Sequence, residues 1–261
     1  MRPLCTQAQA LDPRSVATAR RLAYTLLRLR RYTEALAACD RALALDPGNL
    51  DVVQTKAMVF LAQSDLKGAR QVVRAVTQEV EPTVLVAFFS NYWDLYWVLD
   101  VGQQALLLRL PPSAFDDRTV WAIVLAQAYH SRGELPRARA YADSARVAFG
   151  ERVRATPGDA QSHVFLGLAL AYLDRKAEAV REGARGLALA PVAKDAYNGP
   201  YLQHQLARIY LLAGEPEKAL DQLEPLLKIP YYLSPGWLKI DPTFTPLRGN
   251  PRFERLVNAK P

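Results

Sequence analysis

The sequence of 261 residues has few cysteines and no long apolar run, and both absences limit what the chain can be. Its two cysteines, Cys5 and Cys39, are too few for a disulfide framework. No apolar run reaches the length of a membrane span, and the opening MRPLCTQAQALDP lacks the apolar core of a signal peptide. We therefore expect a soluble chain in the cytoplasm, or in the periplasm if it is part of a longer membrane-anchored protein.

Motifs of catalysis and metal binding are absent as well. The three histidines stand in separate segments, and no two are spaced like metal ligands: His130, His163 and His204. A glycine-rich phosphate loop with its lysine, an HRD-type catalytic loop and a Gly-x-Ser-x-Gly elbow are all missing. The carboxylate pair Asp116–Asp117 precedes a predicted helix near Thr119 and is equally well placed to cap it. We expect no enzyme activity, no cofactor and no metal.

The charge of the chain is basic but dispersed. Lysine and arginine number 33 against 26 acidic residues, which gives a formal net charge of +7. The arginines are scattered along predicted helices, and the densest cluster is Arg28, Arg30 and Arg31. No basic stripe is interleaved with aromatic residues, as a single-stranded nucleic acid would require. This pattern indicates solvated helix faces, and we expect no nucleic-acid partner.

Helical periodicity and a repeat of 34 residues dominate what is present. Runs of alternating β-branched residues are absent, so the sequence predicts an all-α fold. Segment Val16–Asn49 predicts two helices joined by a turn at Arg30-Arg31-Tyr32 and closed by Asp46-Pro47-Gly48-Asn49. Small residues at Ala23, Ala35 and Ala42 allow the two helices to approach closely. A fixed period of this length is typical of a stacked solenoid.

These residues resemble the tetratricopeptide repeat, a helix–turn–helix unit of 34 residues. The same slots are filled in four further segments: Leu50–Thr83, Thr119–Gly150, Ala160–Pro191 and Pro200–Tyr231. The second helix of the Thr119–Gly150 unit is predicted to continue to a stop at Thr156-Pro157. The resemblance implies a right-handed superhelical solenoid of about six helical hairpins over residues 16–233.

The unit at residues 84–118 departs from the pattern because aromatic residues replace the small ones. We expect Leu85 to Trp97 to form one helix and Val101–Leu110 a short partner. The aromatic side chains either fill volume where the superhelix bends, or Tyr92 and Tyr96 present an aromatic stripe to a ligand one helical turn apart.

The two ends of the chain differ. Residues 1–15 look like the second helix of a missing unit, because Cys5, Ala8 and Pro13 stand 34 residues before Cys39, Ala42 and Pro47. An open solenoid end exposes an apolar face, so the chain is expected to be part of a longer protein or to self-associate through this half-repeat. Residues 234–261 are predicted to fold back as a capping tail, with recognition by another protein as the alternative. The tail carries the pattern W-L-x-I-D-P-x-F-x-x-L-R-x-x-P-R-F. In this it is similar to the C-terminus of bacterial tetratricopeptide regions that follow serine/threonine kinase or nucleotide-cyclase modules.

The resemblance also implies a concave groove lined by the first helix of each pair. The positions that correspond to groove residues and the aromatic stripe give the candidate partner-binding residues Arg20, Tyr24, Gln54, Met58, Phe88, Tyr92, Tyr96, Gln127, His130, Tyr201, His204 and Arg208. We expect a non-enzymatic scaffold that binds a peptide or partner segment in this groove. The alternative is a regulatory or sensory C-terminal portion of a kinase- or cyclase-linked bacterial signalling protein.

Overall fold

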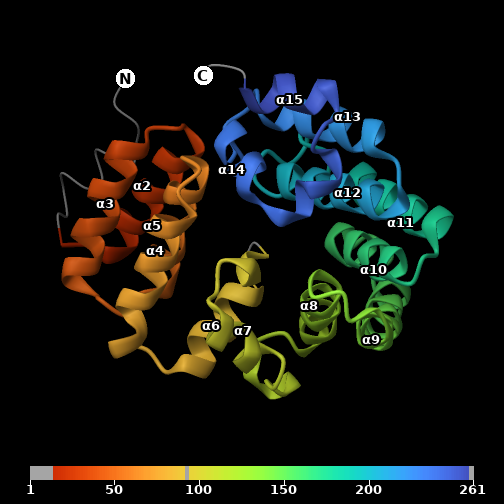
Figure 1. Ribbon diagram of the computed structural model, residues 1–261, viewed down its shortest axis with the longest axis horizontal. Coiled ribbons are helices and arrows are strands. Elements are labelled where there is room, and N and C mark those ends of the chain that lie inside the picture. The colour runs from red at the N-terminus through yellow and green to blue at the C-terminus, as the bar shows by residue number, and fades with distance from the viewer. Residues whose placement is uncertain (1–13, 92–93, 259–261) are drawn as a thin grey trace.

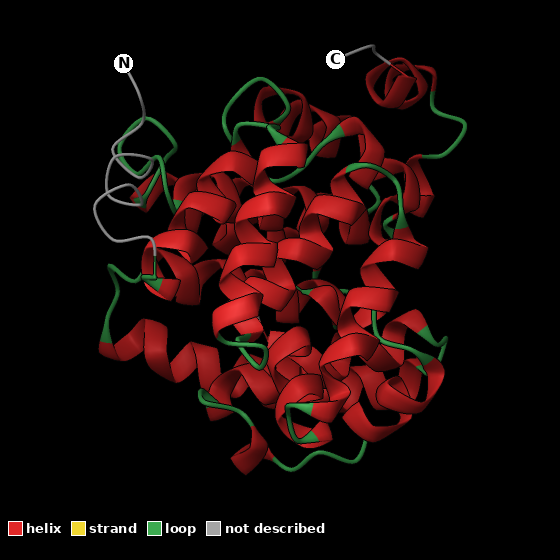
Figure 2. Cartoon of the chain, turned by 90° about the vertical axis from the view of Figure 1, so that its left-hand side faces the viewer, coloured by secondary structure: helices red, strands yellow, loops and turns green. Residues whose placement is uncertain are grey.

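The computed structural model describes residues 14–91 and 94–258, and the regular elements in these ranges are all helices (Figure 2). The longer helices pack as successive pairs, and each pair packs on the next. The pairs are α2 (Val16–Arg28) with α3 (Tyr32–Leu45), α4 (Leu50–Ala62) with α5 (Leu66–Ala75), α6 (Pro82–Asn91) with α7 (Val101–Leu107), α8 (Arg118–Ser131) with α9 (Leu135–Ala155), α10 (Ala160–Tyr172) with α11 (Lys176–Leu189), and α12 (Gly199–Ala213) with α13 (Pro216–Leu226). The predicted all-α solenoid is confirmed.

Short polar side chains and glycines explain the helix boundaries and the close packing. Ser15, Asn49 and Asp159 each accept a hydrogen bond from a backbone N–H in the first turn of the helix that follows. Helix α9 runs to Ala155, as the sequence predicts. Between α10 and α11 the backbones almost touch, since a Cβ on Gly186 would lie 2.5 Å from the carbonyl oxygen of Ala160. Glycine is therefore required at this crossing.

The aromatic unit does not form the single helix predicted from Leu85 to Trp97. Helix α6 ends at Asn91, and Asp94 follows with φ 55° and ψ 40°, in the left-handed region. A short 3-10 helix, η2 (Leu95–Trp97), then leads to α7, which starts at a capping box between Asp100 and Gln103. A left-handed residue ends a helix, so the prediction of one continuous aromatic helix is wrong.

The last residues close the solenoid on itself. The tail consists of α14 (Pro235–Ile240), η4 (Pro242–Leu247, a 3-10 helix) and α15 (Pro251–Asn258). Helix α15 packs on α13 and η4 packs on α12, while α14 packs on α4 in the second pair of helices. Figure 1 shows the resulting ring, in which the C-terminal helices return to the side of the N-terminal pairs. The tail therefore contacts both the last pair of helices and the second pair.

Polar contacts fasten this closure. The hydroxyl of Ser234 donates to the carbonyl oxygen of Ala62 at 2.6 Å, and the hydroxyl of Ser64 donates to the carbonyl oxygen of Gly236 at 2.9 Å. Arg28 of α2 donates to the carbonyl oxygen of Pro230 at 3.1 Å. Because each of these bonds joins residues more than 160 positions apart in the sequence, they bind the two ends of the solenoid together.

The half-repeat predicted in residues 1–15 lies almost wholly outside the described residues, and so does Tyr92. Among the residues that the structure describes, no helix has both the length and the apolar character needed to cross a membrane.

Candidate binding surface

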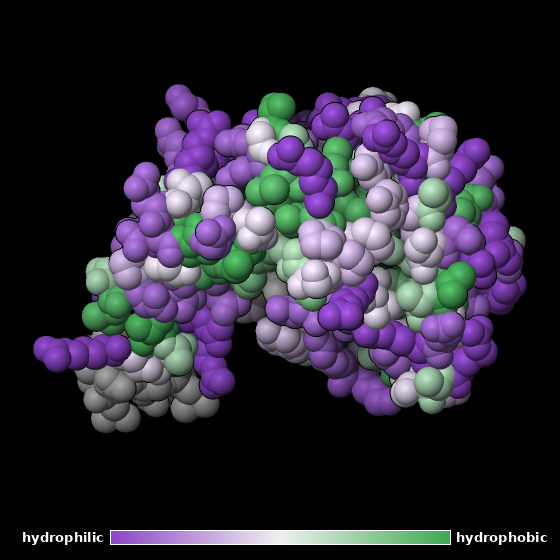
Figure 3. Space-filling model, turned by 90° about the horizontal axis from the view of Figure 1, so that it is seen from below, coloured by the Kyte–Doolittle hydropathy of each residue, from purple (hydrophilic) through white to green (hydrophobic). Residues whose placement is uncertain are grey.

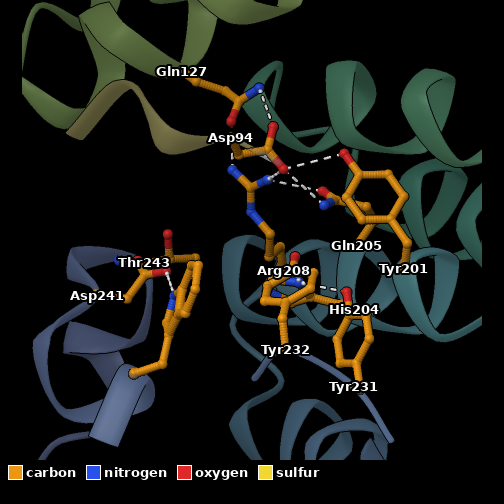
Figure 4. Close-up of polar contacts among 11 residues, drawn as sticks. Asp94, Gln127, Tyr201, His204, Gln205, Arg208, Tyr231, Tyr232, Asp241 and Thr243 are labelled. Carbon is orange, nitrogen blue, oxygen red and sulfur yellow. Dashed lines mark hydrogen bonds and ion pairs between the residues drawn. The ribbon is translucent and has the colours of Figure 1, made fainter. Parts of the chain in front are cut away.

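A buried polar cluster lies in the middle of the concave side. Its centre is an ion pair between Asp94 and Arg208, with 2.6 Å between the carboxylate oxygen and guanidinium nitrogen. Gln205 and Tyr201 donate to the same carboxylate at 2.8 and 3.3 Å, and Gln127 accepts a hydrogen bond from Arg208. Figure 4 shows these side chains converging from α8, α12 and the segment after α6. We call these five residues the Asp94–Arg208 cluster.

The Asp94–Arg208 cluster accounts for the left-handed backbone conformation of Asp94 in the aromatic unit. Asp94 has a left-handed backbone conformation, and its carboxylate accepts hydrogen bonds from side chains of two helices. A charge at this buried position would be very costly if it had no partner. Arg208 is only 3% exposed. Burial alone opposes its charged form, but the nearby Asp94 carboxylate outweighs this effect and raises the pKa of Arg208 above its ordinary value. The guanidinium is therefore charged at all physiological pH values.

Aromatic side chains of the tail fill the space beside this cluster. Tyr231, Tyr232, Trp237 and Phe244 are each at most 1% exposed, and we call them the aromatic plug. The hydroxyl of Tyr232 lies 3.1 Å from Nδ1 of His204, and the ring of Phe244 stacks on the same histidine at 5.9 Å. Burial, with a smaller contribution from the charge of Arg208, lowers the pKa of His204 to about 3. His204 is therefore a neutral member of the core at pH 7.

The predicted groove residues differ in how far they are exposed. His130 is exposed, and Arg20, Tyr24, Phe88 and Tyr201 are half-buried. The others that the structure describes are buried: Gln54, Met58, Tyr96, Gln127, His204 and Arg208. Three predicted residues, Gln127, Tyr201 and Arg208, meet in the Asp94–Arg208 cluster, although the sequence analysis expected them to face a partner.

The structure also shows that Asp94, Gln205 and the aromatic plug belong to this region, which the sequence analysis missed. One signal could have pointed to the cluster. Helix α12 carries Tyr201, Gln205 and Arg208 at helical spacing, and polar residues on a buried face require partners elsewhere in the fold.

Three of the predicted groove residues share one open pocket of about 440 Å³, which we call the α2–α4 pocket. Its lining residues come from α2, the start of α4 and the loop before α12: Arg20, Arg21, Tyr24, Asp51, Gln54, Thr55 and Tyr197. Arg20 forms an ion pair with Asp51 at its edge, and the rings of Tyr24 and Tyr197 meet edge to face at 6.4 Å. The pocket thus combines positive charge with aromatic surface.

Phe88 of α6 lies in a different pocket. It lines a smaller pocket of about 140 Å³ together with Val84 and Phe115. Val84 is 52% exposed and Val101 is 82% exposed. Figure 3 views the molecule from below, the side on which α6 and α7 lie in Figure 1, and shows apolar surface near the middle with polar side chains around it.

No group of at least three histidine, cysteine or acidic side chains is arranged to hold a metal in the part of the chain that the structure describes. The most suggestive pair, His163 and Glu182 at 2.8 Å, is explained by packing. The second ring nitrogen of His163 lies 3.1 Å from the carbonyl oxygen of Pro157, so the imidazole connects α10 to both neighbouring segments. Asp117, considered above as half of a carboxylate pair, caps α8 by accepting from the N–H of Thr119 at 2.9 Å.

Two family models, both described as tetratricopeptide repeat, match the chain at residues 2–49 and 26–82. No curated protein matches the sequence. Among solved structures, the chain is similar to one in the Cut9–Hcn1 hetero-tetramer of the APC/C, with 16% identity, 86% of this chain covered and a TM-score of 0.49; it spans only 42% of that chain.

Smaller proteins are also similar in structure. A tetratricopeptide-repeat protein of the thermophile Thermus thermophilus is 21% identical, with 82% of this chain and 91% of that one covered and a TM-score of 0.35. YrrB, described as having an unusual peptide-binding site, is 15% identical, with 87% and 92% covered and a TM-score of 0.30.

Proposed function

Because this chain is a tetratricopeptide-repeat protein, we propose that it is a non-enzymatic scaffold that binds a peptide segment of another protein at the α2–α4 pocket. The observation that carries the proposal is the location of this pocket. It holds Arg20, Tyr24 and Gln54, three of the residues predicted to face a partner, and it stays open beside the plugged centre of the concave side.

The chemistry of the pocket favours an acidic peptide with an aromatic side chain. Asp51 balances the charge of Arg20, which leaves the exposed Arg21 to attract a carboxylate. Tyr24 and Tyr197 line the pocket with aromatic rings, and the guanidinium of Arg28 lies over both rings, 5.9 and 5.4 Å from their centroids. A preformed pocket reduces the ordering cost of binding, so we expect micromolar affinity, roughly −8 kcal/mol.

The proposal is tested by selecting binding peptides from a random displayed library and measuring their affinity for point variants. Arg21→Glu is expected to weaken binding about tenfold or more, because it places a negative charge beside an acidic ligand. Arg41→Glu, an equally exposed arginine on α3 outside the pocket, is the matched control. Equal binding by the wild type and Arg21→Glu would place the peptide elsewhere.

Among the other predicted groove residues, the buried Met58 and His204 could contact a partner only if the tail moved away from them. The association with a kinase or cyclase module stays a prediction. Co-purification of the chain with such a module would support it.

A further inference from the structure

The α2–α4 pocket is assembled from the two ends of the solenoid. Six of its seven lining residues lie on α2 and α4, whereas the seventh, Tyr197, belongs to the loop before α12. The rings of Tyr24 and Tyr197 meet edge to face at 6.4 Å, so the two ends are in contact inside the pocket. A peptide side chain that packs on both rings would therefore touch both ends at once.

Arg28 fastens these two walls to each other. Its guanidinium lies 5.9 Å from the centroid of the Tyr24 ring and 5.4 Å from that of the Tyr197 ring. The same group donates to the carbonyl oxygens of Ala196 at 2.9 Å and of Pro230 at 3.1 Å. Both carbonyls belong to the C-terminal end of the solenoid. The position of Tyr197 in the pocket therefore depends on the contact between the two ends.

The two ends also meet outside the pocket. We call the contacts of α2, α4 and the turn after α2 with residues 196–236 the seam. Arg30, in that turn, donates to the carbonyl oxygen of Leu227 at the end of α13. Gly236 of α14 lies against the end of α4, where a Cβ would come within 2.5 Å of the carbonyl oxygen of Ala62. Ala62 is seven positions (62 − 55) after Thr55 of the pocket, about 10 Å along the helix. The seam can therefore be altered without changing a residue that lines the pocket.

We propose that peptide binding at the α2–α4 pocket and closure of the seam stabilise each other, because the peptide contacts Tyr24 on one end and Tyr197 on the other. The inference rests on the proposed function of the pocket. A ligand favours the state to which it binds better, and such a coupling is reciprocal. Opening the seam removes Tyr197 from the pocket and weakens binding, while a bound peptide makes opening of the seam less favourable. The tail thus regulates the pocket without lining it.

The dependence of the pocket on the seam is measured first without a peptide. Fluorine NMR of the full chain labelled with 3-fluorotyrosine reports on Tyr24 and Tyr197, and their signals are assigned with Tyr24→Phe and Tyr197→Phe. Gly236→Ala, which places a methyl group against the α4 backbone, should shift both signals towards that of free 3-fluorotyrosine. Arg30→Asn should do the same, because it removes the bond to Leu227 while asparagine tolerates the left-handed backbone at this position. Unchanged signals in both variants would overturn the proposal.

Two other glycine variants separate the seam from general effects of a methyl group. A Cβ at Gly158 would have no neighbouring atom within 4 Å in the described part of the chain, so Gly158→Ala should keep both wild-type signals. A Cβ at Gly186 would meet the α10 backbone, so Gly186→Ala is destabilised away from the seam and should also keep them. If Gly186→Ala shifts the signals as Gly236→Ala does, loosening of the whole fold explains the result and the coupling is refuted. Circular dichroism verifies that each variant is folded, and Arg30→Asn decides the question if Gly236→Ala does not fold.

Binding is then measured by fluorescence polarisation with a fluorescein-labelled pentapeptide that has four glutamates around a central tyrosine. Gly236→Ala and Arg30→Asn should each weaken binding about fivefold or more, within the usual range of coupling between sites. Gly186→Ala should bind as the wild type does. If the wild type does not bind this peptide, or if Arg21→Glu binds it equally well, the proposed peptide site is wrong. If Arg21→Glu weakens binding and the two seam variants do not, the peptide site is correct and its coupling to the seam is wrong.

Discussion

Replacing Asp94 by asparagine tests whether the buried ion pair holds the closed ring together. The substitution keeps the shape of the side chain and an oxygen acceptor, and asparagine tolerates the left-handed backbone. It removes the only negative charge within 4.0 Å of the Arg208 guanidinium among the described residues. Breaking one partner of a buried pair typically costs about 3–5 kcal/mol. Because asparagine preserves part of the hydrogen bonding, we expect a loss of about 3 kcal/mol, at the lower end of that range.

Urea unfolding followed by circular dichroism measures this loss. In a chain of this size, about 3 kcal/mol corresponds to a fall in Tm of roughly 6–12 °C. Asp174→Asn is the matched control, since Asp174 also has a positive φ, 62°, but forms an exposed ion pair with Lys176 at 3.6 Å. The control should cost less than about 0.5 kcal/mol. Equal losses in the two variants would refute the view that burial makes the Asp94–Arg208 pair essential.

Three further predictions concern packing and protonation. Gly186→Ala should destabilise the protein by about 1–3 kcal/mol in urea unfolding, because its Cβ would lie 2.5 Å from the carbonyl oxygen of Ala160 in α10. A urea midpoint equal to that of the wild type would contradict this geometry. Trp237→Ala should cost about 3–5 kcal/mol by the same measurement, since the indole is 1% exposed; a loss below about 1 kcal/mol would mean that the plug contributes little. His204, with a pKa of about 3 when folded against 6.5 unfolded, binds a proton more readily when unfolded. The free energy of unfolding should therefore decrease as pH falls from about 6.5 towards about 3, by up to roughly 1.4 kcal/mol per pH unit. His204→Phe should reduce this dependence on pH. An unchanged dependence would contradict the conclusion that His204 is buried in its neutral form.

The sequence predicts the local structure of this protein well because the determinants are local. The helices begin after short polar caps such as Asn49, and small residues such as Ala23 lie buried between the paired helices. These features depend on neighbours within one repeat of about 34 residues. The helical stop at Thr156 follows from its own Thr-Pro-Gly-Asp sequence in the same way.

The candidate site was less predictable because it depends on contacts between distant segments. Asp94 and Arg208 are 114 positions apart (208 − 94), and neither residue alone carries a recognisable motif. A groove position such as Met58 was assigned from the geometry of an open solenoid, whereas Met58 is fully buried in the closed one. Periodicity within a repeat does not contain the information on how the ends of the solenoid meet.

The aromatic unit and the tail, which look like two unrelated irregularities in the sequence, take part in one closure. The ring of Trp97 after α6 meets the ring of Trp237 in the tail at 6.5 Å, and Asp94 lies three residues before Trp97. The break in the aromatic helix therefore places the carboxylate towards α12 and the indole towards the tail. In a continuous helix these two side chains, three positions apart, would lie on one face. The loss of the repeat pattern between residues 84 and 118 thus accompanies the contacts that close the ring.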